Sequence, residues 1–206
     1  HRIARRQRQM CIRDRFITCG VGAGWAGLSD RPDRLESSIE GQGLHNCLHY
    51  YIWYYVFEAQ SFVLEEKPAM YLDARVFSDP EKGDLVRHTG RHREIIARMV
   101  TNSNFLVWVR DARRAFRKVF KNWCGGPILP VVVYCRSGRH RSVAASEILK
   151  GALARVEGWG FERSIHISID IEKAGCCCEH CRPDRQICQS IQASIASAVS
   201  ALSGTA

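Results

Sequence analysis

The chain has 206 residues, of which 46% are hydrophobic and 25% charged, and its formal net charge is +9. This composition supports a packed core and argues against a repeat protein or a wholly disordered chain. The most apolar run, residues 50–57, is far shorter than the about 20 residues that a membrane-spanning helix needs, and we recognise no signal peptide. We therefore expect a soluble, cytoplasmic protein with no membrane partner.

The basic charge is concentrated in residues 1–15, which carry six Arg and one Asp. Residues 6–14 resemble the peptide produced when a sequencing adapter is translated, and the alternative is a disordered basic arm that binds nucleic acid or anionic lipid. We assign this segment no function. Residues 16–67 form an irregular, unassigned region, in which the glycines at 20–24 predict a loop because no clear strand precedes them.

From residue 68 onward the hydrophobic pattern becomes regular and predicts one α/β domain over residues 68–202. The expected elements are, in chain order, a strand at 70–77, helices at 95–100 and 105–120, a strand at 131–135, a helix at 143–149, a strand at 164–170 and a helix at 187–202. The break between the first two helices falls near Asn104, a plausible N-cap. This order predicts a parallel βαβ sheet with a C-terminal helix covering it, and ligands at the carboxyl ends of its strands.

The segment from residue 131 to 149 reads as a strand, a short basic loop and the start of a helix. Loop N–H groups and the positive end of the helix would converge where the strand ends, which predicts an anion site. The candidate ligand-binding residues of this loop are Cys135, Arg136, Ser137, Gly138, Arg139, His140, Arg141 and Ser142.

An enzymatic interpretation of the same loop is a cysteine-dependent phosphatase. Cys135 and Arg141 have five residues between them, as in the phosphate loop of those enzymes, where the thiolate is the nucleophile and the Arg supports the transferred group. Only Asp79 and Asp111 are near candidates for the general acid. Tyr134 stands where many such enzymes place a His.

Residues 135–143 also resemble the Cys-Thr-Gly-Gly-x-His-Arg-Ser-Val segment in the C-terminal domain of the RapZ/YvcJ family. Residues 73–80 and 84–90 are similar to that family's Asp-x-Arg-Phe-x-x-Asn-Pro and Leu-Arg-x-Leu-Thr-Gly segments, in the same order. The resemblance covers residues 70–170. No Gly-x4-Gly-Lys-Ser/Thr motif occurs in the chain, so we do not expect the family's N-terminal P-loop domain or its nucleotide hydrolysis.

The resemblance implies a phosphofructokinase-like topology and a non-catalytic module that binds RNA, a phosphorylated amino sugar or a nucleotide. We call residues 135–142 the phosphate loop. The resemblance places five further residues opposite it: Arg75, Asp79, Arg87, Thr89 and Gly90. Ser137 and Asp79 depart from the family's Gly and Asn, which leaves the identity of the ligand open. Whether the chain forms a homo-oligomer is also left open.

Two other features suggest partners. The predicted helix at 105–120 and the residues just after it carry a basic face that, together with the loop, would form a track for phosphate backbones; taken alone it would be an ordinary solvated surface. Its members are Arg110, Arg113, Arg114, Arg117, Lys118 and Lys121.

The second feature is a Cys-rich segment at 176–188. Cys178 and Cys181 have the Cys-x2-Cys spacing of a zinc knuckle, and Cys177 and His166 are the further candidate ligands for a structural Zn²⁺. The alternative is a surface loop of reduced thiols. No other cofactor is expected, and the isolated His88 and His92 are interpreted as surface or capping residues.

Overall fold

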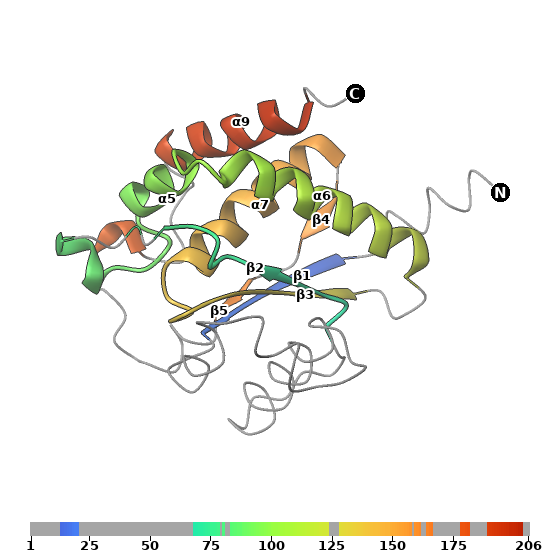
Figure 1. Cartoon of the computed structure of the whole chain (residues 1–206), viewed down its shortest axis with the longest axis horizontal. Helices are drawn as coiled ribbons and strands as arrows, with labels where there is room; N and C mark the ends of the chain where they lie inside the picture. The colour runs from blue at the N-terminus through green and yellow to red at the C-terminus, as the bar shows by residue number, and fades with distance from the viewer. Residues whose placement is uncertain are drawn as a thin grey trace, which may run out of the picture.

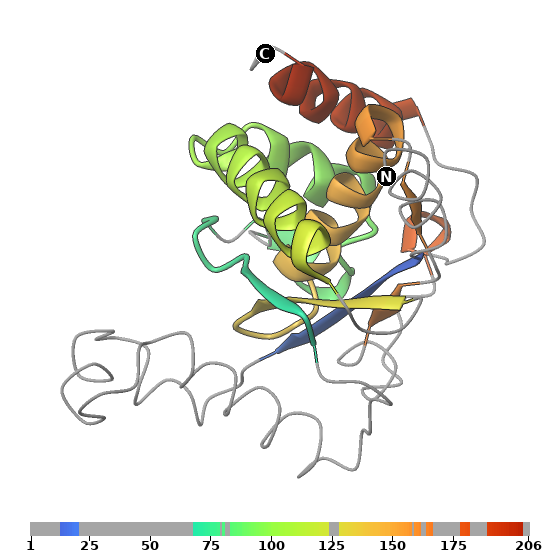
Figure 2. The same cartoon turned by 90° about the vertical axis from the view of Figure 1, so that its right-hand side faces the viewer.

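A computed structural model describes nine segments of the chain: residues 13–20, 68–78, 80, 83–123, 128–157, 159–161, 164–166, 178–181 and 189–203. In these segments a parallel β-sheet carries a layer of helices on one face (Figures 1 and 2). The predicted α/β class is therefore confirmed. None of the described helices combines the length and the apolar character that crossing a bilayer requires.

The sheet of the described residues contains five strands in the order β2-β3-β1-β4, and β5 also pairs with β1. All of the pairings are parallel. The strands are β1 (Arg13–Gly20), β2 (Met70–Asp73), β3 (Ile128–Cys135), β4 (Gly160–Phe161) and β5 (Ile165–His166). The phosphofructokinase-like topology stays a prediction, because strand order alone does not define that fold.

Strand β1 corrects the interpretation of the N-terminal region. It pairs with β3 along its whole length, from Arg13 opposite Ile128 to Gly20 opposite Cys135, so the prediction of a disordered or irregular chain is wrong for Arg13–Gly20. The short strand has little alternation of its own and is held by ladders on both of its edges, with Ile17 fully buried. Residues 1–12 and 21–67 lie outside the described segments.

The helices follow the predicted order. They are η3 (Gly83–Arg87), α5 (Arg93–Val100), α6 (Phe105–Asn122), α7 (Arg141–Glu157), η4 (Glu179–Cys181) and α9 (Gln189–Ser203). Asn104 is the N-cap of α6, although its side chain makes no capping bond; its own N–H donates to Asn102 Oδ1 at 3.0 Å. Helix α9 packs on α7, α5 and α6, so the prediction that it covers the sheet directly is wrong (Figure 1).

The strand predicted at 70–77 ends earlier, at Asp73. The Asp73 carboxylate accepts the backbone N–H of Arg75 at 2.8 Å, and Phe77 N donates to Ala74 O at 3.4 Å, so the chain turns here instead of extending the sheet. Of the strand predicted at 164–170, the structure describes Ser164 and β5. The turn after β2 places residues 74–77 at the carboxyl edge of the sheet.

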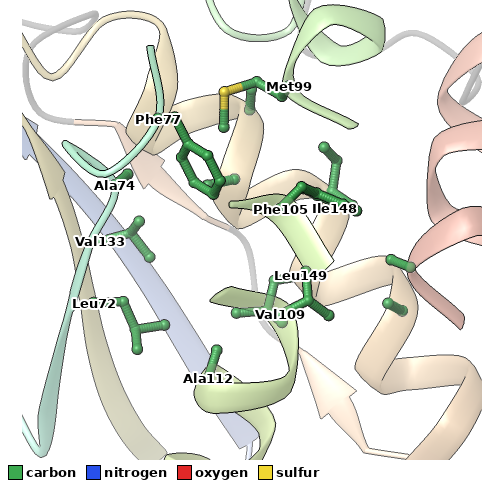
Figure 3. Packing of buried hydrophobic residues seen from close by; sticks show 14 of the residues in the cluster. Leu72, Ala74, Phe77, Met99, Phe105, Val109, Ala112, Val133, Ile148 and Leu149 are labelled. Carbon is green, nitrogen blue, oxygen red and sulfur yellow. The ribbon is translucent and has the colours of Figure 1, made fainter. Parts of the chain in front are cut away.

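The core lies between the sheet and the helices, as Figure 3 shows. Val131, Val133 and Cys135 alternate along β3 and contribute to it, because every second side chain of a strand points to the same face. Phe105 and Val109 of α6 meet them from the helical layer, both fully buried. Burying a side chain of this size contributes about 1.5–3 kcal/mol, so this packing stabilises the contact between α6 and the sheet.

A buried polar group ties α7 to β5. Glu147 Oε1 lies 3.2 Å from His166 Nε2, and Glu147 Oε2 lies 3.1 Å from Lys150 Nζ. Burial opposes ionisation of Glu147, but the hydrogen bond to His166 and the charge of Lys150 lower its pKa to about 2. Burial also lowers the pKa of His166, against the opposing effect of Glu147.

We expect acid to destabilise this fold in two ranges. The pKa of His166 is lowered, so its protonation in the unfolded chain begins to favour unfolding as the pH falls below about 6.5; the stability from Glu147 is present above about 4.5 and is lost as the pH falls toward 2. Glu147→Gln should lower the free energy of unfolding at pH 7 by about 2 kcal/mol and flatten the slope between pH 4.5 and 2, measured by urea titration.

Glu94→Gln is the matched control, because Glu94 forms an exposed ion pair with Arg98. It should change stability by less than about 0.5 kcal/mol at pH 7. An unchanged acid slope in Glu147→Gln would show that this carboxylate does not contribute to acid unfolding.

Candidate functional site

The candidate site is the loop that follows β3. Cys135, the last residue of β3, is fully buried, and its sulfur accepts the N–H of Gly138 at 3.2 Å. Its thiol donates to Ser142 Oγ at 3.3 Å. Gly138 has φ 71°, a left-handed conformation that disfavours a side chain. The loop is therefore wound around the Cys135 sulfur.

Helix α7 begins directly after this loop, as predicted. His140 O accepts the N–H of Ala144 at 2.9 Å, which is the first bond of the helical ladder. A helix leaves its first N–H groups without intrahelical partners, and its dipole is positive at that end. The predicted residues Arg136 and Ser137 are exposed beside this positive end, and Arg139 and Arg141 are half-buried.

A second loop, residues 87–90 and called the facing loop from here on, lies against residues 139 and 140 of the loop after β3. Gly90 N donates to Arg139 O at 2.9 Å, Arg139 Nη2 donates to Arg87 O at 3.1 Å, and His140 Nε2 lies 2.7 Å from His88 O. Thr89, which lies between His88 and Gly90 in the sequence, is almost fully buried. The two loops are thus joined by one backbone hydrogen bond and by two contacts from side chains of the phosphate loop to carbonyls of the facing loop.

Gly90 marks the closest approach of the two loops. A Cβ added there would lie 2.1 Å from His140 O and 2.6 Å from Ala144 N, both backbone atoms that cannot move aside cheaply. No residue with a side chain fits at this position without displacing the start of α7. This contact explains why a glycine is needed at position 90.

Arg75 and Asp73 form the third side of the site. Arg75 binds the Asp73 carboxylate through Nε and Nη2, at 3.0 and 2.8 Å, and its guanidinium lies 5.4 Å from the centre of the Tyr134 ring. Burial and the nearby Asp73 charge raise the pKa of Tyr134, so this side chain is a neutral phenol. The charge of Arg75 is therefore paired with that of Asp73. Asp79, another predicted site residue, lies outside the described residues.

Arg141 joins this turn to the phosphate loop. Its Nη1 donates to Phe77 O at 3.1 Å. The side chain therefore reaches from the first residue of α7 toward the turn after β2. Arg141 and the two loops are brought together at the carboxyl edge of the sheet, where parallel α/β sheets bind ligands.

The C-terminal end of the basic face of α6 lies away from this site. The end of α6 leads to the start of β3, and the phosphate loop follows the other end of that strand, about 25 Å away for eight residues. Glu157 also pairs with Arg113 at 2.5 Å and with Arg117 at 2.9 Å. The first turn of α6 instead lies beside the turn after β2, where Trp108 Nε1 donates to Asp73 O at 2.8 Å, and the track for phosphate backbones stays a prediction.

Asp111, one of the two candidate general acids, lies exposed on α6 in an ion pair with Arg114. The other, Asp79, is outside the described residues. Among the described residues, the loop therefore holds a hydrogen-bonded thiol, Cys135, and an arginine, Arg141. Asp111 lies on the surface of α6.

Of the predicted metal ligands, Cys178 and Cys181 lie together beside His88, whereas His166 does not join them. His166 lies against Glu147, and Cys177 is outside the described residues. Cys178 instead lies with His88 and His92, in a group whose ligating atoms are all within 4.8 Å of one another. The sequence signal for this group was the His-x3-His spacing of residues 88 and 92. That spacing resembles a ligand pair on a helix, but the chain is not helical between these two residues.

The comparisons with known proteins identify the family of the chain. The family model described as the RapZ C-terminal domain matches residues 57–167, which include β2, β3, the phosphate loop and α7. Strand β1, the cysteines at 178 and 181 and helix α9 lie outside the match. No curated protein and no solved structure matched the chain significantly. Since the match spans more than half of its residues, the chain belongs to the RapZ C-terminal domain family.

Proposed function

We propose that this chain is a non-catalytic binding module that recognises the phosphate group of a phosphorylated small molecule, such as an amino-sugar phosphate or a nucleotide. The proposal rests on the hydrogen bonds between the loop at 136–140 and the facing loop. Together with the bond from Arg141 to Phe77 O, they hold Arg139 and Arg141 beside the start of α7. The family suggests a regulatory binding role, in agreement with this proposal.

The loop has the chemistry that a phosphate dianion requires. Backbone N–H groups at a helix start provide fixed dipoles, and guanidinium groups add charge-assisted hydrogen bonds of about 1.5–3 kcal/mol each. Because hydrogen bonds between the two loops already fix the backbone, little ordering remains to be done when the ligand binds. These features support a compact anion as the ligand.

A small molecule is favoured over RNA by the distribution of charge. A phosphate backbone needs several cations along a continuous surface. On the described surface, Glu157 partners Arg113 and Arg117, and Lys118 and Lys121 lie toward the opposite end of the sheet from the loop. The positive charge at the loop is therefore local and matches one phosphate group better than a polynucleotide.

Cys135 is the reason to test catalysis directly. Its sulfur is fully buried and sits between Gly138 N and Ser142 Oγ, which supports a structural role in shaping the loop. The spacing of Cys135 and Arg141, with five residues between them, also matches the phosphate loop of cysteine-dependent phosphatases. The cysteine-dependent phosphatase is therefore the second candidate function.

We expect Arg141→Ala to weaken binding of an amino-sugar phosphate about ten- to a hundredfold, measured by isothermal titration calorimetry, because one charge-assisted contact is lost. The same sugar without its phosphate should show no measurable binding to either protein. Arg117→Ala is the matched control: it also removes one arginine, but from α6, and should leave the affinity unchanged.

An RNA arm tests the competing ligand class. RNA held by the basic face of α6 would lose affinity when Lys118 and Lys121 are replaced by Ala, and its affinity would fall steeply as salt is raised. RNA binding with that behaviour, in the absence of binding to the sugar phosphate, would overturn the proposal.

The Cys135→Ser variant should bind the sugar phosphate within about threefold of the wild-type affinity, because a serine oxygen can also accept the Gly138 N–H. The wild-type protein should release no p-nitrophenol from p-nitrophenyl phosphate. If the wild type turns this substrate over and Cys135→Ser does not, the chain is a phosphatase and the non-catalytic proposal is wrong.

A further inference from the structure

Two segments that are about 90 residues apart in the chain meet beside the facing loop. Cys178 Sγ lies 3.2 Å from His88 Nδ1, and Cys181 Sγ lies 3.7 Å from the same nitrogen. His92 also belongs to the group, since its ligating atom is within 4.8 Å of those of His88 and Cys178. Two imidazoles and the Cys178 thiol thus converge, and the Cys181 thiol lies beside His88, outside the group whose ligating atoms are all within 4.8 Å of one another.

We propose that His88, His92, Cys178 and Cys181 form a structural Zn²⁺ site. Around a tetrahedral zinc ion, with Zn–S of about 2.3 Å and Zn–N of about 2.0 Å, neighbouring ligand atoms lie about 3.3–3.8 Å apart, and a sulfur and a nitrogen about 3.5 Å apart. The two S–N separations, 3.2 and 3.7 Å, lie on either side of that value. To complete the tetrahedron, the Cys181 side chain has to move toward the other three ligands.

The cysteines are arranged as thiolate ligands. Cys178 and Cys181 are joined by a single turn, in which Cys181 N donates to Cys178 O at 3.1 Å. Cys181 Sγ also accepts the N–H of Thr89 at 3.4 Å. An amide that donates to sulfur stabilises the negative charge that a metal-bound thiolate carries.

His92 is also the N-cap of α5, and metal binding would change this role. Its Nδ1 accepts the N–H of Glu94 at 3.3 Å and so caps α5. In that state the proton of the neutral ring is on Nε2, whereas a metal at Nε2 requires the proton on Nδ1. Zinc therefore replaces the long capping bond, and the metal–nitrogen bond fixes the start of α5 in its place.

The donor set selects the metal. Thiolate sulfur and imidazole nitrogen suit Zn²⁺ and not Mg²⁺ or Ca²⁺, which take oxygen ligands. His92 and Cys181 are nearly fully buried, with 7% and 6% of their surface exposed, and four protein ligands leave no open position for a substrate. The site is thus a structural one.

The consequence is a brace behind the candidate phosphate site. His88 O accepts the hydrogen bond of His140, and residues 89–90 contact the phosphate loop. An ion at His88 would attach the segment at 178–181 to this facing loop. The metal site stands independently of the proposed phosphate ligand, because none of its four donors belongs to the phosphate loop.

The test is the metal content of the full-length protein, measured by mass spectrometry after purification without added metal. We expect about one zinc ion per chain, falling below about a tenth of that in the double variant Cys178→Ser and Cys181→Ser. His166→Asn and Cys135→Ser are the matched controls and should retain the zinc. Zinc retained in the double variant, or lost in His166→Asn, would overturn the proposed ligand set.

Cobalt substitution keeps the test sharp if a variant fails to fold. Wild-type protein stripped by a chelator and loaded with Co²⁺ should show intense tetrahedral d–d bands and sulfur-to-cobalt charge transfer, and His88→Asn should weaken or shift these bands. Chelation should lower the melting temperature, and added Zn²⁺ should restore it. Absence of bound metal and no spectral change with Co²⁺ would contradict the proposal, whatever the outcome of the phosphate experiments.

Discussion

Gly90 packs against the backbone at the start of α7 so closely that no Cβ fits between them, and the geometry of the site depends on this contact. The contact brings the facing loop within hydrogen-bond distance of Arg139 and His140. It also places His88 beside both the phosphate loop and the cysteines. Without this contact, the phosphate loop would be held only by the strand before it and the helix after it.

The charges of the protein are divided between structural pairs and the site. Asp73 holds Arg75, and Glu157 holds Arg113 and Arg117, so these arginines join elements of the fold. Such pairs keep a basic chain from presenting one undivided positive surface. What remains beside the start of α7 is a small, local concentration of positive charge, which suits a compact anion.

The proposed metal site gives the segment at 178–181 a reason to be ordered. This segment has one short 3-10 helix and little apolar surface of its own, and a metal bond can supply the stability that such a segment cannot obtain from a core. Its cysteines lie outside the part of the chain that the family model matches. The brace would thus be a property of this chain added to a shared domain.

The sequence alone determined the parts of the fold that are encoded locally. The run of β-branched residues at 131–133, the basic loop after it and the helical spacing from 105 to 120 predicted β3, the phosphate loop and α6, because each pattern lies within one element. The motifs at 73–80, 84–90 and 135–143 identified the family. Each of these features is determined by residues that are close together in sequence.

Only the tertiary structure decided what depends on contacts between distant segments. Strand β1 has a weak pattern and is defined by its neighbours on both edges, and α9 packs on helices because they already cover the sheet. The grouping of His88 with Cys178, and of His166 with Glu147, follows from how α7, β5 and the facing loop pack. Spacing along the chain carries no information about such pairings, since folding alone brings these side chains together.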